Sequence, residues 1–530
     1  MRTVIFGVDG LTFSVLHPMM ERGDLPNFQR LKQEGCEAIL ESKYPPLTPP
    51  AWISLSTGLK PARHGVYDFW AYDEQFECGV TRKARVQTRR KGGKAIWNLL
   101  SEYCKRVLVM NVPMTYPPEA VNGIMISGYM TPSSDTDFTY PLAFKEELYR
   151  EIPGYQIELD FNEIFRGKLD ERAGRRLIDA TLHMTEQRIE LIKYLLNEKP
   201  WDFCYLGFVG PDRLQHPLWK DIVSLETHAV EYFRLLDSAL GLILEKLTPD
   251  DSLFLVSDHG FQGATCTFDI NAYLYRKGLL TLNPGFQQQQ ARASRHAKLK
   301  YSLSQLGLLS LARRAKKALA DAGIVQRNLP QKDKPVLQDN DIDWERTLAY
   351  VPSHSGFGGG YADIFLSDEL SEQRLVEVQE DLKRQVHPKT GKPLVDAIYT
   401  NEVFGSGPYA RRERHLLVLA NDGITFRMDL GDKWLWNDMN RTRGAHQKDG
   451  VLYAFGNGIK RGFKAPNAEI YDLVPTVLRC MGLPLPYTFD GRVLEELFAE
   501  GTRVEQISVT ADNNAKGGLT RRKLSKLLEV

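Results

Sequence analysis

Three aspartates stand where a metal site in an α/β protein would need them. Asp9, Asp212 and Asp258 each lie at or just after the C-terminal end of an apolar run. Open α/β sheets bind their ligands at the edge formed by the carboxyl ends of the strands, so the three carboxylates would converge there. An aspartate after a strand, taken alone, is more often a turn residue or a helix cap, so the prediction depends on the three occurring together.

Three histidines accompany these carboxylates along the chain. His216 follows Asp212 by four residues, and His259 follows Asp258 directly. If the first pair lies on a helix, both side chains share one face at a spacing that suits a common metal ion. His446 precedes another apolar run and is expected in a loop at an edge of the sheet. The spacing does not say whether this is the same edge.

The candidate nucleophile is a threonine that follows a short extended stretch. Thr48 precedes Pro49 and Pro50, which suit the first turn of a helix because proline lacks an N–H that this turn leaves unpaired. We predict Thr48 as the N-cap of a helix that runs to about Thr57 and stops at Gly58. The positive end of the helix dipole would favour an alkoxide and a bound phosphoryl group. The alternative is that Thr48 merely caps the helix.

Short apolar runs that alternate with longer amphipathic stretches would position these side chains. The runs are typical of buried strands in a mostly parallel sheet, and the longer stretches have helical length and periodicity. The predicted class is α/β, doubly wound, with helices flanking the sheet. The predicted strands are 3–9, 106–112, 123–129, 203–210 and 252–258, and the predicted helices are 94–105, 170–199 and 225–247.

The composition is that of an average soluble globular protein. The 530 residues include 68 Lys and Arg against 67 Asp and Glu, so the net charge gives no support to generic polyanion binding. The six cysteines lie far apart without CxxC pairs, which favours a reducing compartment. No apolar run approaches the roughly 18 residues of a membrane span, and no signal-peptide core precedes the first strand. We therefore expect a cytoplasmic enzyme, or one peripheral to the membrane.

Two segments interrupt the α/β pattern. Residues 291–334 carry 11 Lys and Arg against 2 Asp and Glu, and leucines punctuate them. We predict a basic amphipathic insertion or cap over 281–340, and a mobile basic tail over 501–530. One interpretation of the insertion is a helix on an anionic membrane surface, and the other is a cap helix whose leucines pack on the core.

Six motifs occur in a set order along the chain. They are VDG at 8–10, PPLTPPAWISLSTGLKPARHGV at 45–66, GPDRLQH at 210–216, SDHGF at 257–261, GAHQKDGVL at 444–452 and IYDLVPTVLRCMGLPLPYTFDGRVL at 470–494. Together they resemble the alkaline phosphatase superfamily, and within it the type I phosphodiesterase and nucleotide pyrophosphatase family. The resemblance spans about 1–280 and 341–500, and it implies a two-metal catalytic α/β domain with an alkaline-phosphatase-like core.

The resemblance also implies a role for each candidate residue. It places Asp212, His216 and His446 on one divalent metal ion, and Asp9, Thr48, Asp258 and His259 on the other, with Thr48 as the catalytic nucleophile. Mixed histidine and carboxylate ligands suit Zn²⁺ or Mn²⁺ better than Ca²⁺, and Zn²⁺ is the first choice. Two such ions would clamp the attacking and leaving oxygens of a phosphoryl transfer.

The sequence departs from two relatives of this family. Eukaryotic nucleotide pyrophosphatases carry an asparagine shortly after their HG turn, whereas His64 and Gly65 here are followed by Val, Tyr, Asp and Phe, which puts nucleotide specificity in doubt. Sulfatases carry an arginine four positions after the nucleophile, where this chain has Trp52. This substitution argues against sulfate ester hydrolysis.

The functional hypothesis is a metal-dependent hydrolase that cleaves phosphodiester or pyrophosphate bonds through a covalent phosphothreonine. The alternatives are a phosphomonoesterase or phosphotransferase on the same core, and a catalytically inactive protein that docks on a membrane or nucleic acid. The expected partner is a small-molecule or lipid-linked phosphate ester, with an anionic membrane surface as a second candidate partner of 291–334. No specific nucleic acid is expected.

Overall fold

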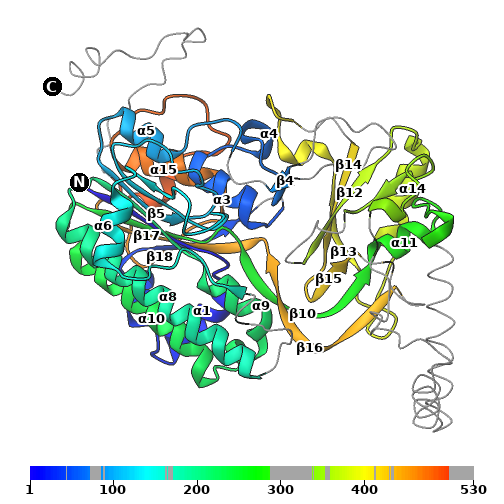
Figure 1. Cartoon of the computed structure of the whole chain (residues 1–530), viewed down its shortest axis with the longest axis horizontal. Helices are drawn as coiled ribbons and strands as arrows, with labels where there is room; N and C mark the ends of the chain where they lie inside the picture. Colours follow the sequence, from blue (N-terminus) through cyan, green and yellow to red (C-terminus); the bar gives the residue numbers. More distant parts are fainter. Residues whose placement is uncertain are drawn as a thin grey trace, which may run out of the picture.

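The computed structural model of the chain describes most of its residues (Figure 1). They are 1–42, 45–71, 85–86, 90–161, 164, 171–286, 337, 339–352, 359–410, 414–428, 430 and 435–500. Most of the predicted insertion over 281–340 and all of the predicted tail over 501–530 lie outside the described residues. Within the part that is described, no helix combines the length and the apolar composition that a membrane span requires.

A ten-stranded sheet forms the centre of the larger part of the molecule. Its order is β18-β2-β17-β9-β1-β8-β5-β6-β7, with β19 also paired to β2. Strand β1 pairs in parallel with β8 and β9, and β5 pairs in parallel with β8 and β6, whereas β17 runs antiparallel to both of its neighbours. The strands are β1 (Thr3–Val8), β2 (Cys36–Glu41), β5 (Val107–Val112), β6 (Gly123–Ser127), β7 (Thr139–Tyr140), β8 (Phe203–Phe208), β9 (Ser252–Val256), β17 (Asp449–Gly456), β18 (Phe463–Lys464) and β19 (Ala468–Glu469).

Helices cover both faces of this sheet, as Figure 1 shows. On one face, α1 (Phe13–Glu21), α2 (Pro26–Glu34), α6 (Phe144–Glu151), α8 (Glu171–Glu198), α9 (Gly210–Val223) and α10 (Thr227–Lys246) enclose one apolar core. On the other face, α3 (Thr48–Thr57), α5 (Ile96–Glu102) and α15 (Leu473–Cys480) enclose a second core, with α4 (Pro61–His64) following α3. Two apolar layers on opposite faces explain why the central strands are buried along their whole length.

A smaller sheet packs beside this α/β unit. It has the order β11-β12-β14-β13, and the long strands β10 and β16 connect it to the larger sheet (Figure 1). Strand β10 pairs with β16 on one side and with β15 on the other. A third apolar core lies between these strands and two helices. The elements are β10 (Gly260–Asp269), α11 (Ile270–Arg276), β11 (Ala349–Tyr350), β12 (Tyr361–Leu366), α14 (Glu372–Lys383), β13 (Val395–Tyr399), β14 (Arg414–Ala420), β15 (Ile424–Arg427) and β16 (Trp436–Gln447). Separately, β3 (Trp70–Ala71) pairs antiparallel with β4 (Arg85–Val86).

The predicted α/β class with a mostly parallel sheet is confirmed. All five predicted strands and all three predicted helices are present, and their boundaries differ from the prediction by at most three residues. Because β1, β8 and β9 run in parallel, their C-terminal ends lie at one edge of the sheet. The polar residues that follow these strands therefore meet there.

Two local predictions need correction. Thr48 is the first residue of α3 and Leu47 is its N-cap, so the helix begins one residue earlier than predicted, while its end at Gly58 with a φ of +67° is as predicted. His446 lies within strand β16 and not in a loop. The reason is that the segment pairs with β10, where His446 is the register partner of Phe261.

Candidate metal centre

The turn after β1 and the start of α9 hold two of the carboxylates together. The backbone N–H of Asp212 donates to the carbonyl of Asp9 at 3.2 Å. The side-chain amide of Gln215 donates to the carbonyl of Gly10 at 2.6 Å, which ties the first turn of α9 to the same loop. His216 follows Asp212 by one turn of α9, so the predicted helical pair is confirmed.

The turn between β9 and β10 carries the third carboxylate and a histidine. The backbone N–H of Gly10 donates to Oδ1 of Asp258 at 3.1 Å. The hydroxyl of Ser257 donates to the carbonyl of His259 at 2.6 Å. Both Asp258 and His259 are fully buried. The first hydrogen bond holds the carboxylate of Asp258 against the loop that follows β1, and the second orders the turn itself.

All three histidines have the same orientation. In each of them, Nδ1 contacts a backbone carbonyl. The pairs are His216 with Gly444 at 3.2 Å, His259 with Gly260 at 3.2 Å and His446 with Pro46 at 3.0 Å. A carbonyl only accepts, so Nδ1 carries a proton, and in the neutral form of each ring Nε2 is the nitrogen with the lone pair. Histidines that bind metals in proteins usually show this arrangement, in which the second nitrogen is held by a hydrogen bond.

One group of acceptor atoms forms around Asp212. Its Oδ1 lies 3.3 Å from Nε2 of His216 and 3.1 Å from Nε2 of His446, and the two Nε2 atoms lie 3.1 Å apart. When both rings are in the neutral form with the proton on Nδ1, none of these three atoms has a proton to share with the others. Acceptors that face each other in this way are stabilised by a positive charge between them, which a proton or a metal ion can supply.

A second group of acceptor atoms forms around His259. Its Nε2 lies 3.5 Å from Oδ1 of Asp9 and 3.3 Å from Oδ2 of Asp258. These three atoms are also buried atoms without a hydrogen-bond partner. Because unpaired buried polar atoms are costly, three of them directed at one point fit a metal ion.

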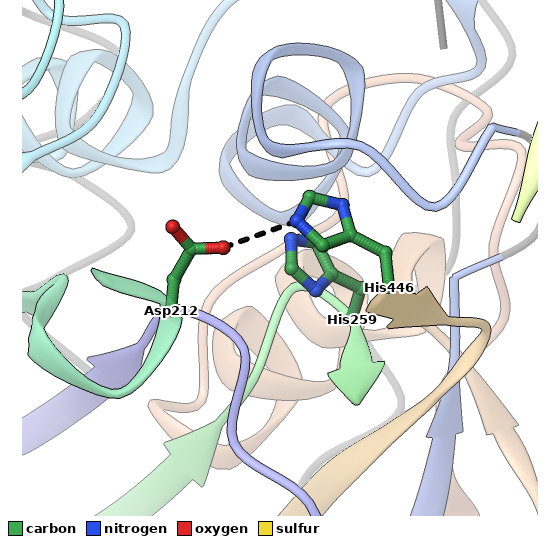
Figure 2. Close-up of side chains that lie close together, drawn as sticks. All are labelled: Asp212, His259 and His446. Carbon is green, nitrogen blue, oxygen red and sulfur yellow. Dashed lines mark hydrogen bonds and ion pairs between the residues drawn. The ribbon is translucent and has the colours of Figure 1, made fainter. Parts of the chain in front are cut away.

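The two groups are adjacent. The rings of His259 and His446 stack with centroids 3.8 Å apart and an angle of 23° between their planes (Figure 2). Ligand atoms of Asp212, His259 and His446 all lie within 4.8 Å of one another, as do those of Asp9, Asp258 and His259. His259 therefore lies within reach of ligand atoms of both groups, whereas the resemblance placed it on one ion.

Burial and like charge set the protonation of this cluster. Burial raises the pKa of Asp9 well above its ordinary value, with the charges of Asp258 and Asp212 adding to the effect. Burial raises the pKa of Asp258 in the same direction. It lowers the pKa of both His259 and His446, so these rings are neutral near pH 7. Crowded carboxylates with neutral imidazoles are a donor set that a divalent cation would stabilise.

The candidate nucleophile lies at the start of α3, beside this cluster. Thr48 is buried, and Trp52 lies one helical turn after it on the same face. The indole N–H of Trp52 donates to Oδ2 of Asp9 at 3.2 Å, and the carbonyl of Pro46 contacts His446 as described above. Residues on both sides of Thr48, Pro46 before α3 and Trp52 within it, are thus in contact with the two groups.

Arg213 is a neighbour of the centre that the sequence analysis did not consider. It follows Asp212 in the GPDRLQH motif, and its Nη1 donates to Oδ2 of Asp212 at 2.6 Å. Burial alone would raise the pKa of Asp212, but the charge and hydrogen bond of His216, followed by the hydrogen bond of His446 and the charge of Arg213, hold it well below its ordinary value. The sequence feature that could have identified Arg213 is its position, because a cationic residue directly follows a candidate metal ligand.

An α/β core with clustered carboxylates and histidines at one sheet edge defines a protein of the alkaline-phosphatase-like class. The sequence matches the family described as type I phosphodiesterase / nucleotide pyrophosphatase over residues 3–447. The chain belongs to this family, and it is a phosphoric ester hydrolase of the phosphodiesterase and nucleotide pyrophosphatase type.

Solved structures share the fold at low sequence identity. Phosphonoacetate hydrolase from Sinorhizobium meliloti 1021, in complex with phosphonoacetate, is 13% identical with a TM-score of 0.53, and the match covers 89% of this chain and 94% of that one. An inactive variant of murine ectonucleotide pyrophosphatase / phosphodiesterase 5, in complex with AMP, is 12% identical with a TM-score of 0.50 and coverage of 94% and 100%. Both similarities concern the fold.

Proposed function

We propose that this enzyme cleaves phosphodiester or pyrophosphate bonds with the help of two divalent metal ions, and that a phosphothreonine forms at Thr48. The observation that carries the proposal is the convergence of Asp9 Oδ1, Asp258 Oδ2 and His259 Nε2, three buried atoms without a partner, beside a family-typical nucleophile position. The family membership supports the reaction class.

The ligand set divides between the two ions as the family resemblance implies. Asp212, His216 and His446 would hold one ion, and Asp9, Thr48, Asp258 and His259 would hold the other. When bound, such ions stabilise the charge of a transferring phosphoryl group and acidify a hydroxyl and a water. Zn²⁺ suits these histidine and carboxylate ligands best, and Mn²⁺ is the alternative.

The reaction proceeds in two displacements at phosphorus. The hydroxyl oxygen of Thr48 forms a bond to phosphorus while the bond to the leaving alcohol or phosphate breaks, and the hydroxyl proton passes to the leaving group or to solvent. Water then attacks the phosphothreonine, which restores the threonine hydroxyl and releases the second product with one added oxygen. The N-terminus of α3, where Thr48 is the first residue, favours the negative charge of the phosphoryl group.

A small phosphorus compound is the proposed substrate class. The two structures with this fold were solved with AMP and with phosphonoacetate, which are small molecules carrying one phosphorus centre. A lipid-linked ester remains part of the proposal because of the basic residues at 291–334, within the predicted insertion over 281–340. That segment would bring the enzyme to an anionic membrane surface from the cytoplasmic side.

The deciding experiment compares three generic substrates. An aryl phosphodiester, an aryl phosphomonoester and an aryl sulfate are incubated with the enzyme in Zn²⁺ and in Mn²⁺, after its metal content has been measured. We expect the diester to be the fastest, with activity that chelation removes and added metal restores. Faster turnover of the monoester would support the phosphomonoesterase alternative. Full activity after exhaustive chelation would contradict the metal proposal.

A further inference from the structure

A buried arginine links the metal centre to an acidic residue outside it. Nη1 of Arg213 donates to Oδ2 of Asp212 at 2.6 Å. Nη2 and Nε of the same guanidinium donate to the two carboxylate oxygens of Glu158, at 2.8 and 3.3 Å. Only 9% of the Arg213 side chain is exposed, and its guanidinium lies 4.2 Å from the ring centroid of Tyr129. Charge-assisted contacts of this forked kind hold an arginine in one orientation.

The segment that carries Glu158 is itself held in place. The backbone N–H of Leu159 donates to Oε1 of Glu158 at 2.9 Å, which orients the carboxylate. Arg188, which is buried on α8, donates to the carbonyl of Ile157 at 2.9 Å and to the carbonyl of Gly207 near the end of β8 at 3.3 Å. The position of Glu158 is therefore set relative to the sheet edge that carries the metal centre.

The arrangement has a consequence for how Asp212 can bind a cation. Its Oδ2 is occupied by Arg213, so Oδ1 is the oxygen that faces His216 and His446. An arginine so close to a divalent ion would repel it unless a second carboxylate balanced the charge. Glu158 supplies that charge through both of its oxygens.

We propose that Arg213 and Glu158 are positioning residues of the metal centre, with Arg213 holding Asp212 in a geometry that binds through one oxygen and Glu158 neutralising the arginine. This inference rests on the proposed function, because it presumes that Asp212 binds a metal ion. The rival role for Arg213 is direct contact with the phosphate of the substrate. Its Nε, Nη1 and Nη2 already donate to carboxylates, which argues against that role.

The test measures metal affinity without substrate. Zn²⁺ is titrated into the metal-free full-length protein in competition with a chromogenic chelator, for the wild type, Glu158→Gln and Arg213→Lys. We expect each variant to bind one of the two Zn²⁺ ions, the one proposed at Asp212, about 10 to 100 times less tightly, which is the usual effect of removing a residue that orients a metal ligand. Lysine keeps the charge of Arg213 but cannot bridge two carboxylates as a fork.

A matched control lies on the same helix. Asp221 of α9 pairs with Arg441 of β16 away from the centre, so Asp221→Asn should leave Zn²⁺ affinity unchanged. The double variant Arg213→Lys/Glu158→Gln should lose less affinity than the product of the two single losses, because both changes break one network. Circular dichroism confirms that each variant is folded, and if Glu158→Gln does not fold, Arg213→Lys decides.

The outcomes separate the two proposals. Wild-type protein that binds neither Zn²⁺ nor Mn²⁺ would contradict the proposed function. A wild type that binds metal, together with folded variants of unchanged affinity, would overturn only the positioning role. So would a raised KM for the aryl diester in Arg213→Lys at saturating Zn²⁺ with unchanged metal affinity, because that result assigns Arg213 to the substrate.

Discussion

The indole N–H of Trp52 donates to Oδ2 of Asp9 at 3.2 Å, one helical turn after Thr48. This hydrogen bond joins the helix of the candidate nucleophile to a carboxylate that follows the first strand of the sheet. Trp52 occupies the position at which sulfatases carry an arginine. This chain therefore has the neutral indole N–H of Trp52 where a sulfatase has a cationic side chain. The indole donates to the candidate metal ligand Asp9 and not to solvent, since both side chains are fully buried.

Replacing Trp52 by phenylalanine should weaken metal binding. The change leaves Oδ2 of Asp9 buried without its hydrogen-bond donor, which costs about 1–3 kcal/mol of folding stability. The carboxylate of Asp9 is then no longer held in one orientation by that donor. Trp97→Phe is the control, because Trp97 donates to Glu119 at 3.0 Å within the same apolar core but outside the centre. Both variants should lose thermal stability, and only Trp52→Phe should lose Zn²⁺ affinity in the chelator competition. Equal affinities in the two variants would disprove the link.

The Thr48→Ala variant should lose turnover of an aryl phosphodiester and still bind metal, because the other proposed ligands remain. Thr48→Ser should retain part of the rate, since the attacking oxygen survives. Mass spectrometry of acid-quenched wild-type enzyme should find a phosphoryl adduct on Thr48. A near-normal rate in the alanine variant would rule out the covalent route.

The His216→Ala variant should lose one of two bound ions, the ion that activates water in the second step. The rate should fall by orders of magnitude while the chain stays folded, because His216 is only partly buried. His183→Ala, an exposed histidine on α8, is the matched control. Metal content after dialysis is the measurement, and two ions per chain in His216→Ala would contradict the assignment.

The Asp258→Asn variant should be more stable than the wild type without metal and less stabilised by metal. Burial raises the pKa of Asp258 well above the ordinary value of 3.8, so the ionised group destabilises the metal-free fold. Protonated Asp258 makes its full contribution to folding stability below pH 3.8, the pKa of this carboxyl in the unfolded chain. That contribution is lost as the pH rises through the higher pKa of the folded state. In chelator at pH 8, Tm should therefore be higher in the variant, and the difference should vanish near pH 4.

Added Zn²⁺ should raise Tm strongly in the wild type and little in Asp258→Asn, because ligand binding to the folded state is what shifts the equilibrium. Asp237→Asn is the control, since burial also raises the pKa of Asp237, which lies outside the centre. That variant should keep the full response to Zn²⁺. An Asp258→Asn protein with the wild-type response would show that this carboxylate is not a ligand.

The Gly10→Ala variant tests the packing around the centre. Gly10 has a φ of +72°, and a Cβ there would lie 2.7 Å from Cε2 of Phe261, the ring that packs against the histidines. Gly23→Ala is the control, because its φ of +82° imposes the same strain with no atom within 4 Å. Both substitutions should cost about 1–2 kcal/mol for the left-handed backbone, and Gly10→Ala should also lower Zn²⁺ affinity. If Gly10→Ala and Gly23→Ala had the same Zn²⁺ affinity, the contact between the new Cβ and Phe261 would be relieved without moving the candidate metal ligands.

The sequence by itself determined the elements and part of the centre. Apolar runs of strand length predict parallel strands, and the C-terminal ends of parallel strands share one edge, so Asp9, Asp212 and Asp258 were expected together from local pattern alone. The four-residue spacing of Asp212 and His216 is a property of any helix, and α9 has it. These features depend only on the local periodicity of the backbone.

The position of His446 was decided by the tertiary structure. It contacts Asp212 across 234 residues of sequence, and its spacing in the chain does not say which edge it reaches. Strand β17 runs antiparallel to β9, so it begins at the edge where β9 ends, and β16 delivers His446 there just before β17 starts. The Trp52 contact with Asp9 and the Arg213 contact with Glu158 likewise join separate elements. Strand direction and packing across layers are set by the burial of apolar surface over the whole chain, which no short stretch of sequence encodes.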